Sequence, residues 1–191
     1  HELRTPLTLV QGPLQDVLDG RLGPTPEPVR RQVETVLASG RRLGDLVEQL
    51  LDVAQLEAGS FELHRRRHDI HPLLARIEVA FAALARARRV QWTSSLPPAP
   101  VEGFVDADQF EKVVSNLLAN ALKFTPEGGG VRFGVTVGPD RVLRVVVADT
   151  GPGIPKAAQA QVFERFRQVD DSPQRSPGGA GLGLSLVKEI V

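Results

Sequence analysis

The stretch 116–124 reads Asn116-Leu117-Leu118-Ala119-Asn120-Ala121-Leu122-Lys123-Phe124, and its pattern is that of a helix with one polar and one apolar face. Asn116 and Asn120 are four residues apart, so they share the polar face, and Lys123 lies near it. An amide oxygen can ligate Mg²⁺, and a lysine ammonium can meet phosphate as a point charge. From these residues alone, the polar face is either a site for a phosphate-bound cation or simply a solvated surface.

Downstream, Asp149-Thr150-Gly151-Pro152-Gly153-Ile154-Pro155 follows an apolar run at 142–148. A carboxylate at the end of a buried strand can accept a hydrogen bond from one exocyclic amine and so select adenine. Gly151 and Gly153 allow a tight turn and a close approach to a flat ring. An ordinary Asp-Gly turn is the alternative, but the doubled glycine after a strand favours a binding role.

Further on, Gly178-Gly179-Ala180-Gly181-Leu182-Gly183-Leu184-Ser185 opens the last predicted helix, at 184–191. Exposed backbone N–H groups at a helix N-terminus favour anions, so this segment predicts a polyphosphate cradle. It is not a Walker loop, because no GxxxxGK occurs, and it lacks the preceding strand of a Rossmann fingerprint. The stretch between the two glycine clusters carries Phe163 and Phe166 and is interpreted as a lid over a nucleotide.

Upstream, apolar residues recur at spacings of four and three in two segments, 1–19 and 28–59. Gly and Pro interrupt the pattern at 20–28, so we expect an antiparallel helical hairpin, with a kink at Pro6 and a C-cap at Gly59. The apolar stripe is too broad for one hairpin to hide. It therefore predicts a homodimer through a four-helix bundle, unless the hairpin packs on its own downstream domain.

The rest of the chain mixes strand and helix patterns. We expect a strand at 61–64, a helix at 70–88, a strand at 90–93, a helix after 106 capped by Asp106 or Asp108, and a hairpin of two buried strands at 131–137 and 142–148. The predicted fold class is therefore α+β. A helical hairpin domain at 1–59 is followed by an α/β domain at 60–191. We interpret His64, His68 and His71 as surface residues, and Arg65-Arg66-Arg67 as a solvated charge run.

The bulk composition suits a globular protein and excludes several classes. The chain has 191 residues, with 23 basic and 23 acidic side chains, so no global field favours nucleic acid or an anionic membrane. The absence of Cys excludes disulfides, thiolate metal sites and thiol nucleophiles. No apolar run is long enough to predict a membrane span.

Motifs in five places, taken together and in this order, resemble the H, N, G1, F and G2 boxes of the sensor histidine kinases. They read His1-Glu2-Leu3-Arg4-Thr5-Pro6-Leu7, Asn116-Leu117-Leu118-Ala119-Asn120-Ala121-Leu122-Lys123-Phe124, Asp149-Thr150-Gly151-Pro152-Gly153-Ile154, Phe163-Glu164-Arg165-Phe166, and Gly179-Ala180-Gly181-Leu182-Gly183-Leu184. The stretch 8–14 is also similar to large hybrid kinases of two-component systems.

The resemblance implies a dimeric phospho-acceptor bundle and an ATP-binding α/β sandwich of the histidine kinase, Hsp90 and gyrase type. By this likeness His1 attacks the γ-phosphate of ATP, and Asn120 ligates Mg²⁺. The nucleotide-binding residues that it implies are Asn116, Asn120, Lys123, Phe124, Asp149, Gly151, Gly153, Gly179, Gly181, Leu182 and Gly183.

The resemblance also implies roles for two neighbours of His1. Glu2 would act as a general base or orient the imidazole, and Thr5 would help place the water that dephosphorylates a partner response-regulator receiver domain. The receiver aspartate would take the phosphoryl group from His1. The family habit implies a cytoplasmic core of a membrane-attached parent protein, and an ATP-binding domain that continues past Val191.

Two alternatives stay open. One is a scaffold or phosphatase-biased pseudokinase, although no motif residue is missing. The other is an ATP-driven conformational machine, such as a chaperone or topoisomerase ATPase, which would carry Glu in place of Asn116 and would leave His1 without a role.

Overall fold

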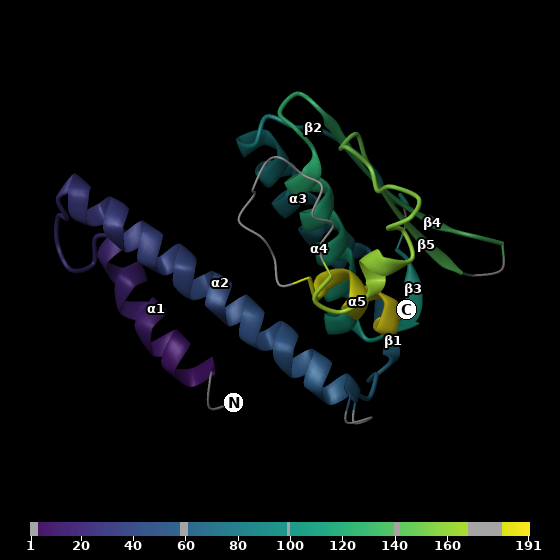
Figure 1. Ribbon diagram of the computed structural model, residues 1–191, viewed down its shortest axis with the longest axis horizontal. Helices are drawn as coiled ribbons and strands as arrows, with labels where there is room; N and C mark the ends of the chain where they lie inside the picture. The colour runs from purple at the N-terminus through teal and green to yellow at the C-terminus, as the bar shows by residue number, and fades with distance from the viewer. Residues whose placement is uncertain (1–3, 58–60, 99, 140–141, 168–180) are drawn as a thin grey trace. The chain divides into compact units, whose positions relative to one another are not determined.

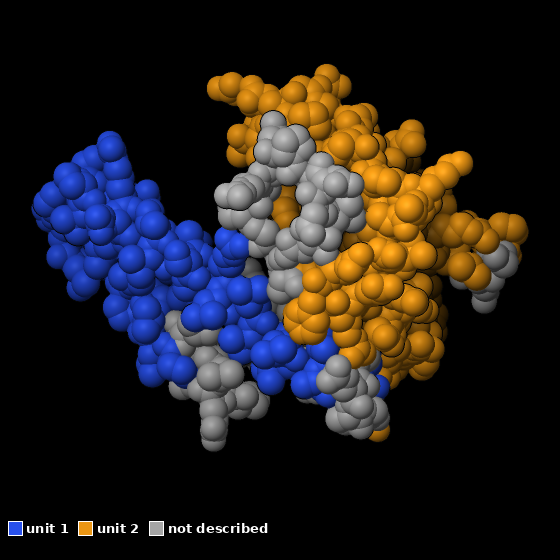
Figure 2. Space-filling view, viewed as in Figure 1, with its two compact units in different colours: residues 1–61 blue, residues 62–191 orange. Residues whose placement is uncertain are grey.

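The computed structural model describes residues 4–57, 61–98, 100–139, 142–167 and 181–191. The chain divides into two compact units, His1–Phe61 and Glu62–Val191, which Figure 2 colours separately. The first is helical and the second mixes helices with strands. The α+β fold class predicted from the sequence is therefore confirmed.

The first unit is a hairpin of α1 (Arg4–Leu18) and α2 (Glu27–Glu57), shown in Figure 1. The turn between them contains Gly20 and Gly23 at φ values of 74° and 101°, a region that costs glycine little. The predicted break at 20–28 is thus confirmed. The expected kink at Pro6 depends on the carbonyl of Glu2, and the expected C-cap is Gly59. Glu2 and Gly59 lie outside the described residues.

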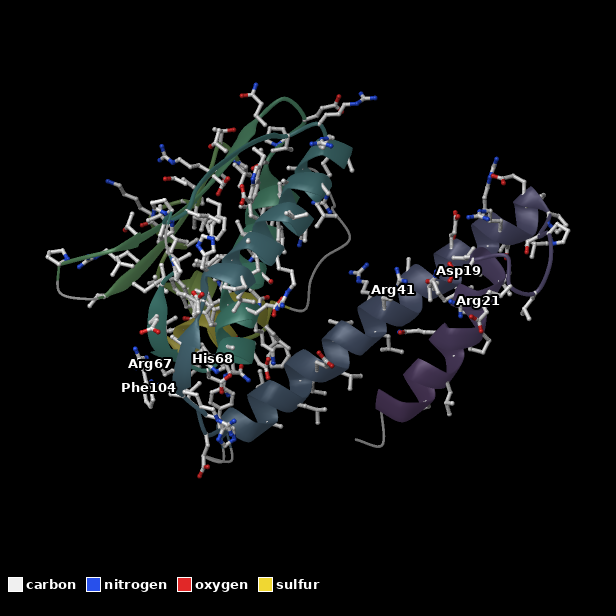
Figure 3. All side chains as sticks on the ribbon, turned by 180° about the vertical axis from the view of Figure 1, so that it is seen from behind. Asp19, Arg21, Arg41, Arg67, His68 and Phe104 are labelled. Carbon is white, nitrogen blue, oxygen red and sulfur yellow. The ribbon has the colours of Figure 1, made fainter. Side chains whose placement is uncertain are left out.

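The two helices of the hairpin meet through a partly polar contact. The side chain of Gln11 on α1 lies over two glycines of α2, within 3.7 Å of a methyl built on Gly40 and 4.0 Å of one built on Gly44. Nearby, Arg41 Nη2 donates to Gln15 Oε1 at 2.9 Å. Figure 3 labels Arg41 on α2. Small residues on α2 therefore let an amide-bearing helix approach closely.

Much of the apolar stripe on the hairpin stays open to solvent. Leu37 and Val53 are buried, at 4% exposure each. Other stripe residues are about half exposed, namely Val29, Val36, Leu43, Leu50 and Leu51. The hairpin of a single chain therefore leaves an uncovered apolar face.

The second unit is built on a three-stranded sheet in the order β2-β4-β5, with β2 parallel to β4 and β4 antiparallel to β5. The strands are β2 (Gln91–Ser95), β4 (Gly130–Val137) and β5 (Leu143–Asp149). Helices α3 (His71–Ala87) and α4 (Ala107–Phe124) cover one face, as Figure 1 shows. A separate ribbon pairs β1 (Arg66–Asp69) with β3 (Glu102–Val105), and the chain continues through η1 (Gln161–Phe163) to α5 (Gly183–Ile190).

The core lies between the sheet and the helices. Leu74 from α3, Leu118 from α4 and Phe133 from β4 are all fully buried. Among the described residues no helix covers the other face of the sheet, and Val146 on β5 is 51% exposed. The prediction of two buried strands is therefore wrong in part, because only one face of this hairpin is covered.

The strand predicted at 61–64 is also wrong. The strand begins at Arg66, because its partner β3 fixes the register, with Arg66 opposite Val105 and Asp69 opposite Glu102. The charge run is exposed, as expected, and Arg67 donates to Glu102 across the ribbon. That hydrogen bond and the negative charge of Glu102 raise the pKa of Arg67.

Histidines of the second unit differ in their exposure. His64 is exposed, as predicted, whereas His68 and His71 are half-buried. Within the described ranges, no group of His, Asp and Glu residues has the arrangement of a metal site. Nor does any described helix have the length and apolar character needed to cross a membrane.

Candidate functional site

Helix α4 carries the polar face on which the site is built. The Asp106 carboxylate caps the helix by accepting from the Gln109 N–H at 3.1 Å, which settles the choice between Asp106 and Asp108. Asn116 and Asn120 are both half-buried on this helix. Asn116 Nδ2 donates to the Lys112 carbonyl at 3.0 Å, so the side-chain amide is held in one orientation with its oxygen pointing away from that bond.

The oxygen of Asn116 faces the beginning of α5. A methyl built on Gly183, the first residue of α5, would lie 2.7 Å from Asn116 Oδ1. A side chain at position 183 would therefore have to displace the amide of Asn116. Leu182 as a whole is buried, at 2% exposure.

The aspartate of the second motif lies at the C-terminal end of α4. Asp149 ends β5, is exposed, and accepts from the Gly151 N–H through Oδ1 at 2.8 Å. A carboxylate offers about four acceptor positions, so capacity remains for a further donor. A methyl on Gly151 would lie 2.9 Å from the Phe124 carbonyl oxygen, which brings this turn against the last residue of α4.

The end of α4 also presents a cation and a ring. Lys123 Nζ lies 4.8 Å from the centroid of the Phe124 ring, within cation–π range. The Phe124 side chain is 47% exposed. The exposed Phe124 ring offers a flat apolar surface and the Asp149 carboxylate offers a directional acceptor, which are the two features that a purine base needs.

The phenylalanine motif is tied to the start of α5. The Phe166 N–H donates to the Gly181 carbonyl at 3.0 Å, and both residues have positive φ, 60° and 72°. Arg165 Nη2 lies 3.7 Å from Glu189 Oε1 on α5. Most of the stretch interpreted as a lid, at 168–180, lies outside the described residues.

The structure brings some predicted site residues together and leaves others without a described position. Asn116 meets Gly183, and Phe124 meets Gly151 beside Asp149. Gly153 adopts a φ of 73° in open space. His1, Glu2 and Gly179 lie outside the described residues, and Thr5 lies on α1 with no described side chain.

One group of residues next to the site was not predicted. Thr125 and Thr150 converge on Gly129, in the turn that connects α4 to β4. The available signal was a threonine just after the predicted helix, followed by three consecutive glycines at 128–130.

Comparisons with known proteins match both units. A family model described as "His Kinase A (phospho-acceptor) domain" matches residues 1–59, and one described as "Histidine kinase-, DNA gyrase B-, and HSP90-like ATPase" matches residues 105–191. The chain is 40% identical over 195 residues to the Hybrid signal transduction histidine kinase D of Dictyostelium discoideum, covering 100% of this chain and 12% of that protein.

Solved structures are also similar. The crystal structure of full-length ShkA in complex with AMPPNP aligns with a TM-score of 0.74 at 32% identity, covering 100% of this chain and 38% of that one. The Mycobacterial sensor histidine kinase MprB aligns with a TM-score of 0.52 at 30% identity, covering 61% of this chain and 76% of that one. The chain spans well under half the length of the curated relatives that it matches.

Proposed function

This chain belongs to the histidine kinase family, and from that premise we propose that it is a protein-histidine kinase that phosphorylates itself on His1 with ATP. The observation that carries the proposal is the meeting of α4 with both glycine segments, with Asn116 against Gly183 and Phe124 against Gly151. These contacts gather amides, a carboxylate and a helix N-terminus around one part of the domain. Such a set of groups suits an adenine nucleotide.

Asp149 reads the exocyclic amine of adenine, and the exposed ring of Phe124 offers an apolar surface for the nucleotide. Gly151 and Gly153 let the backbone pass close to the base. Gly179, Gly181, Leu182 and Gly183 are the residues that we assign to the phosphates, because the dipole at the N-terminus of α5 favours their negative charge. Lys123 adds a positive charge near the same helix face.

The amides of α4 suit a phosphate-bound Mg²⁺. The hydrogen bond from Asn116 Nδ2 to Lys112 leaves its oxygen as the outward acceptor, and Asn120 is on the same face one turn later. Asn120 is the ligand that we assign, with Asn116 beside it. When bound, the ion neutralises charge on the phosphate oxygens.

His1 supplies the nucleophile. A bond forms between its Nε2 and the γ-phosphorus while the bond from that phosphorus to the β–γ bridging oxygen breaks, and ADP leaves. Glu2 orients the ring through the other nitrogen or takes its proton, which makes Nε2 more nucleophilic. Positioning and charge neutralisation do most of the work in such a transfer.

The phosphoryl group then passes to an aspartate of a response-regulator receiver domain. Thr5 follows His1 by four residues, the spacing that puts two residues on one face of a helix, and we assign its hydroxyl to placing the water that dephosphorylates the receiver. The exposed apolar stripe of the hairpin supports a homodimer through a four-helix bundle. By family likeness, the core belongs to a membrane-attached parent protein and lies on its cytoplasmic side.

Incubation with γ-labelled ATP and Mg²⁺ tests the kinase assignment. We expect acid-labile, base-stable label on the chain, and its loss in His1→Gln. His64→Gln is the matched control, because His64 is an exposed histidine outside the motifs. Label that survives His1→Gln at the level of the control contradicts the proposal.

The same assay separates the other candidate activities. Asn120→Asp and Asp149→Asn should remove the label together with nucleotide binding. Nucleotide binding without label in the unaltered chain would indicate a pseudokinase, and steady release of phosphate without label would indicate an ATP-driven conformational machine.

Thr5→Ala tests the proposed division of labour on α1. It should leave autophosphorylation unchanged and slow the dephosphorylation of a phosphorylated receiver. Equal loss of both activities would refute the role given to Thr5.

A further inference from the structure

Thr150, which follows β5, is bonded twice to Gly130 at the start of β4. The Thr150 N–H donates to the Gly130 carbonyl at 3.0 Å, and the Gly130 N–H donates to Thr150 Oγ1 at 2.9 Å. Thr150 therefore makes hydrogen bonds to Gly130 through both its backbone N–H and its side-chain hydroxyl. The pair joins the first residue of β4 to the residue that follows β5.

Thr150 is exposed, but its hydroxyl lies close to the backbone of Gly129. A methyl built on Gly129 would lie 2.8 Å from Thr150 Oγ1 and 2.7 Å from Thr125 Cγ2, so the Cα of Gly129 fills the space between two threonine side chains. Thr125 is itself fixed, being 7% exposed and donating from Oγ1 to the Ala121 carbonyl at 2.7 Å. The end of α4 thus reaches Thr150 through a chain of direct contacts.

In the sequence, Thr150 lies between the two motif residues of this end of the site, Asp149 and Gly151. Asp149 precedes it and Gly151 follows it, and they are joined by the bond from the Gly151 N–H to Asp149 Oδ1. Gly151 in turn packs against the Phe124 carbonyl. A shift of the Thr150 backbone must move Asp149, because the two share a peptide bond.

We propose that Thr150 is a positioning residue of the nucleotide site, whose hydroxyl, by accepting from the Gly130 N–H, fixes the Asp149 carboxylate where it reads the exocyclic amine of adenine. The proposal rests on the proposed function, which gives Asp149 that role. Thr150 itself needs no contact with the nucleotide.

The test compares two nucleotides on the 191-residue chain. Dissociation constants are measured for ATP and for purine riboside triphosphate, which lacks the exocyclic amine. The constant for purine riboside triphosphate divided by the constant for ATP is the ratio that reports how well the amine is recognised. Thr150→Val keeps the shape but loses the acceptor, and the ratio should fall about two- to tenfold, the value of one ordinary hydrogen bond. Thr150→Ser keeps the hydroxyl and should keep the ratio.

The ratio distinguishes a loss of amine recognition from a general loss of folding stability. A variant that only lowers the folded fraction weakens both nucleotides by the same factor and leaves the ratio unchanged. Thr93→Val, at an exposed threonine of β2, makes the same substitution outside the site and should leave the ratio unchanged. An unchanged ratio in Thr150→Val overturns the proposal.

Asp149→Asn distinguishes this failure from failure of the proposed function. If Asp149→Asn keeps the ratio of the unaltered chain, Asp149 does not read the amine, and both the role given to Asp149 and the role given to Thr150 are wrong. If Asp149→Asn brings the ratio close to one while Thr150→Val leaves it unchanged, only the role of Thr150 is wrong.

A second variant covers the case in which Thr150→Val does not fold. Gly129→Ala acts on the same contact from the other side, because its methyl must displace Thr150 Oγ1 or Thr125 Cγ2. It should lower the ratio in the same direction. Amide exchange of Gly130 in the unaltered chain needs no variant at all, and fast exchange of that N–H would overturn the proposal.

Discussion

The hairpin and the second unit treat their apolar side chains differently. In the second unit, Leu118 and Phe133 are fully buried within one chain. In the hairpin, Leu37 is buried, but Val36 and Leu43 are 50% and 51% exposed. The second unit therefore closes a core of its own, whereas the hairpin leaves part of its apolar stripe exposed, as expected of a surface that packs against another one.

The largest expected effect tests whether the second unit is self-sufficient. Phe133→Ala removes a fully buried ring from the core and should lower the free energy of unfolding of this unit by about 3–5 kcal/mol. Denaturant unfolding measures this change. Val146→Ala, on the exposed face of the same sheet, should cost less than about 0.5 kcal/mol. Similar costs for the two variants would break the comparison.

The next effect tests whether the hairpin needs a second copy. Leu43→Ala should weaken the homodimer by about 1–2 kcal/mol per copy, and a symmetric interface counts the loss twice. Sedimentation equilibrium measures the dimer dissociation constant. Val79→Ala, at a residue 71% exposed on α3, is the control. A chain that stays monomeric at every concentration would show that the stripe has another occupant.

A smaller effect probes local order in the self-contained unit. Asp106→Ala removes the cap of α4 and also the acceptor of the His64 N–H, so the free energy of unfolding should fall by about 1 kcal/mol. Asp106→Asn should retain most of the stability that the cap contributes. Asp108→Ala, at an exposed carboxylate in the first turn, is the matched control, and an equal loss there would remove the special role of Asp106.

The smallest effect shows how little the surface contributes. Arg76 Nη2 lies 2.8 Å from Glu111 Oε2 and joins α3 to α4, but the side chains are 67% and 40% exposed. Arg76→Gln should cost about 0.2–1 kcal/mol at low salt and less at high salt, because water and ions screen the pair. Unfolding curves at two salt concentrations measure this difference. A loss as large as that of Phe133→Ala would mean that surface charge, not the core, stabilises this unit.

The helices were predictable because their signal is local. Apolar spacing placed helices at 28–59 and 70–88, and the structure has Glu27–Glu57 and His71–Ala87. Each residue in such a pattern depends only on neighbours three or four positions away. Packing on other elements changed the ends of these helices by a few residues and did not change their type.

The small ribbon was not predictable in the same way. Alternation suggested a strand at 61–64, whereas β1 begins at Arg66, and no pattern marked Glu102–Val105 as a strand. Both errors have one cause, since β1 and β3 are defined by pairing with each other across a long stretch of chain. A short polar strand takes its register from its partner.

The site was partly predictable. The motifs led to the expectation that α4 and the glycine segments form one site, and the structure places Gly183 at Asn116 and Gly151 at Phe124. The chemical roles of these residues stay predictions. The packing of Gly129 between two threonines could not be read from the sequence, because it depends on side chains that only the folded chain brings together.

For redesign, the glycines at this end of the second unit fall into two kinds. Gly128 and Gly153 have φ values of 82° and 73° and open space around them, so Asn or a D-residue is a reasonable replacement. At Gly129 and Gly151 the surroundings leave no space for a side chain, because any added carbon would lie within 3 Å of neighbouring atoms. An engineer who wants a different nucleotide preference should therefore vary the first kind and keep the second.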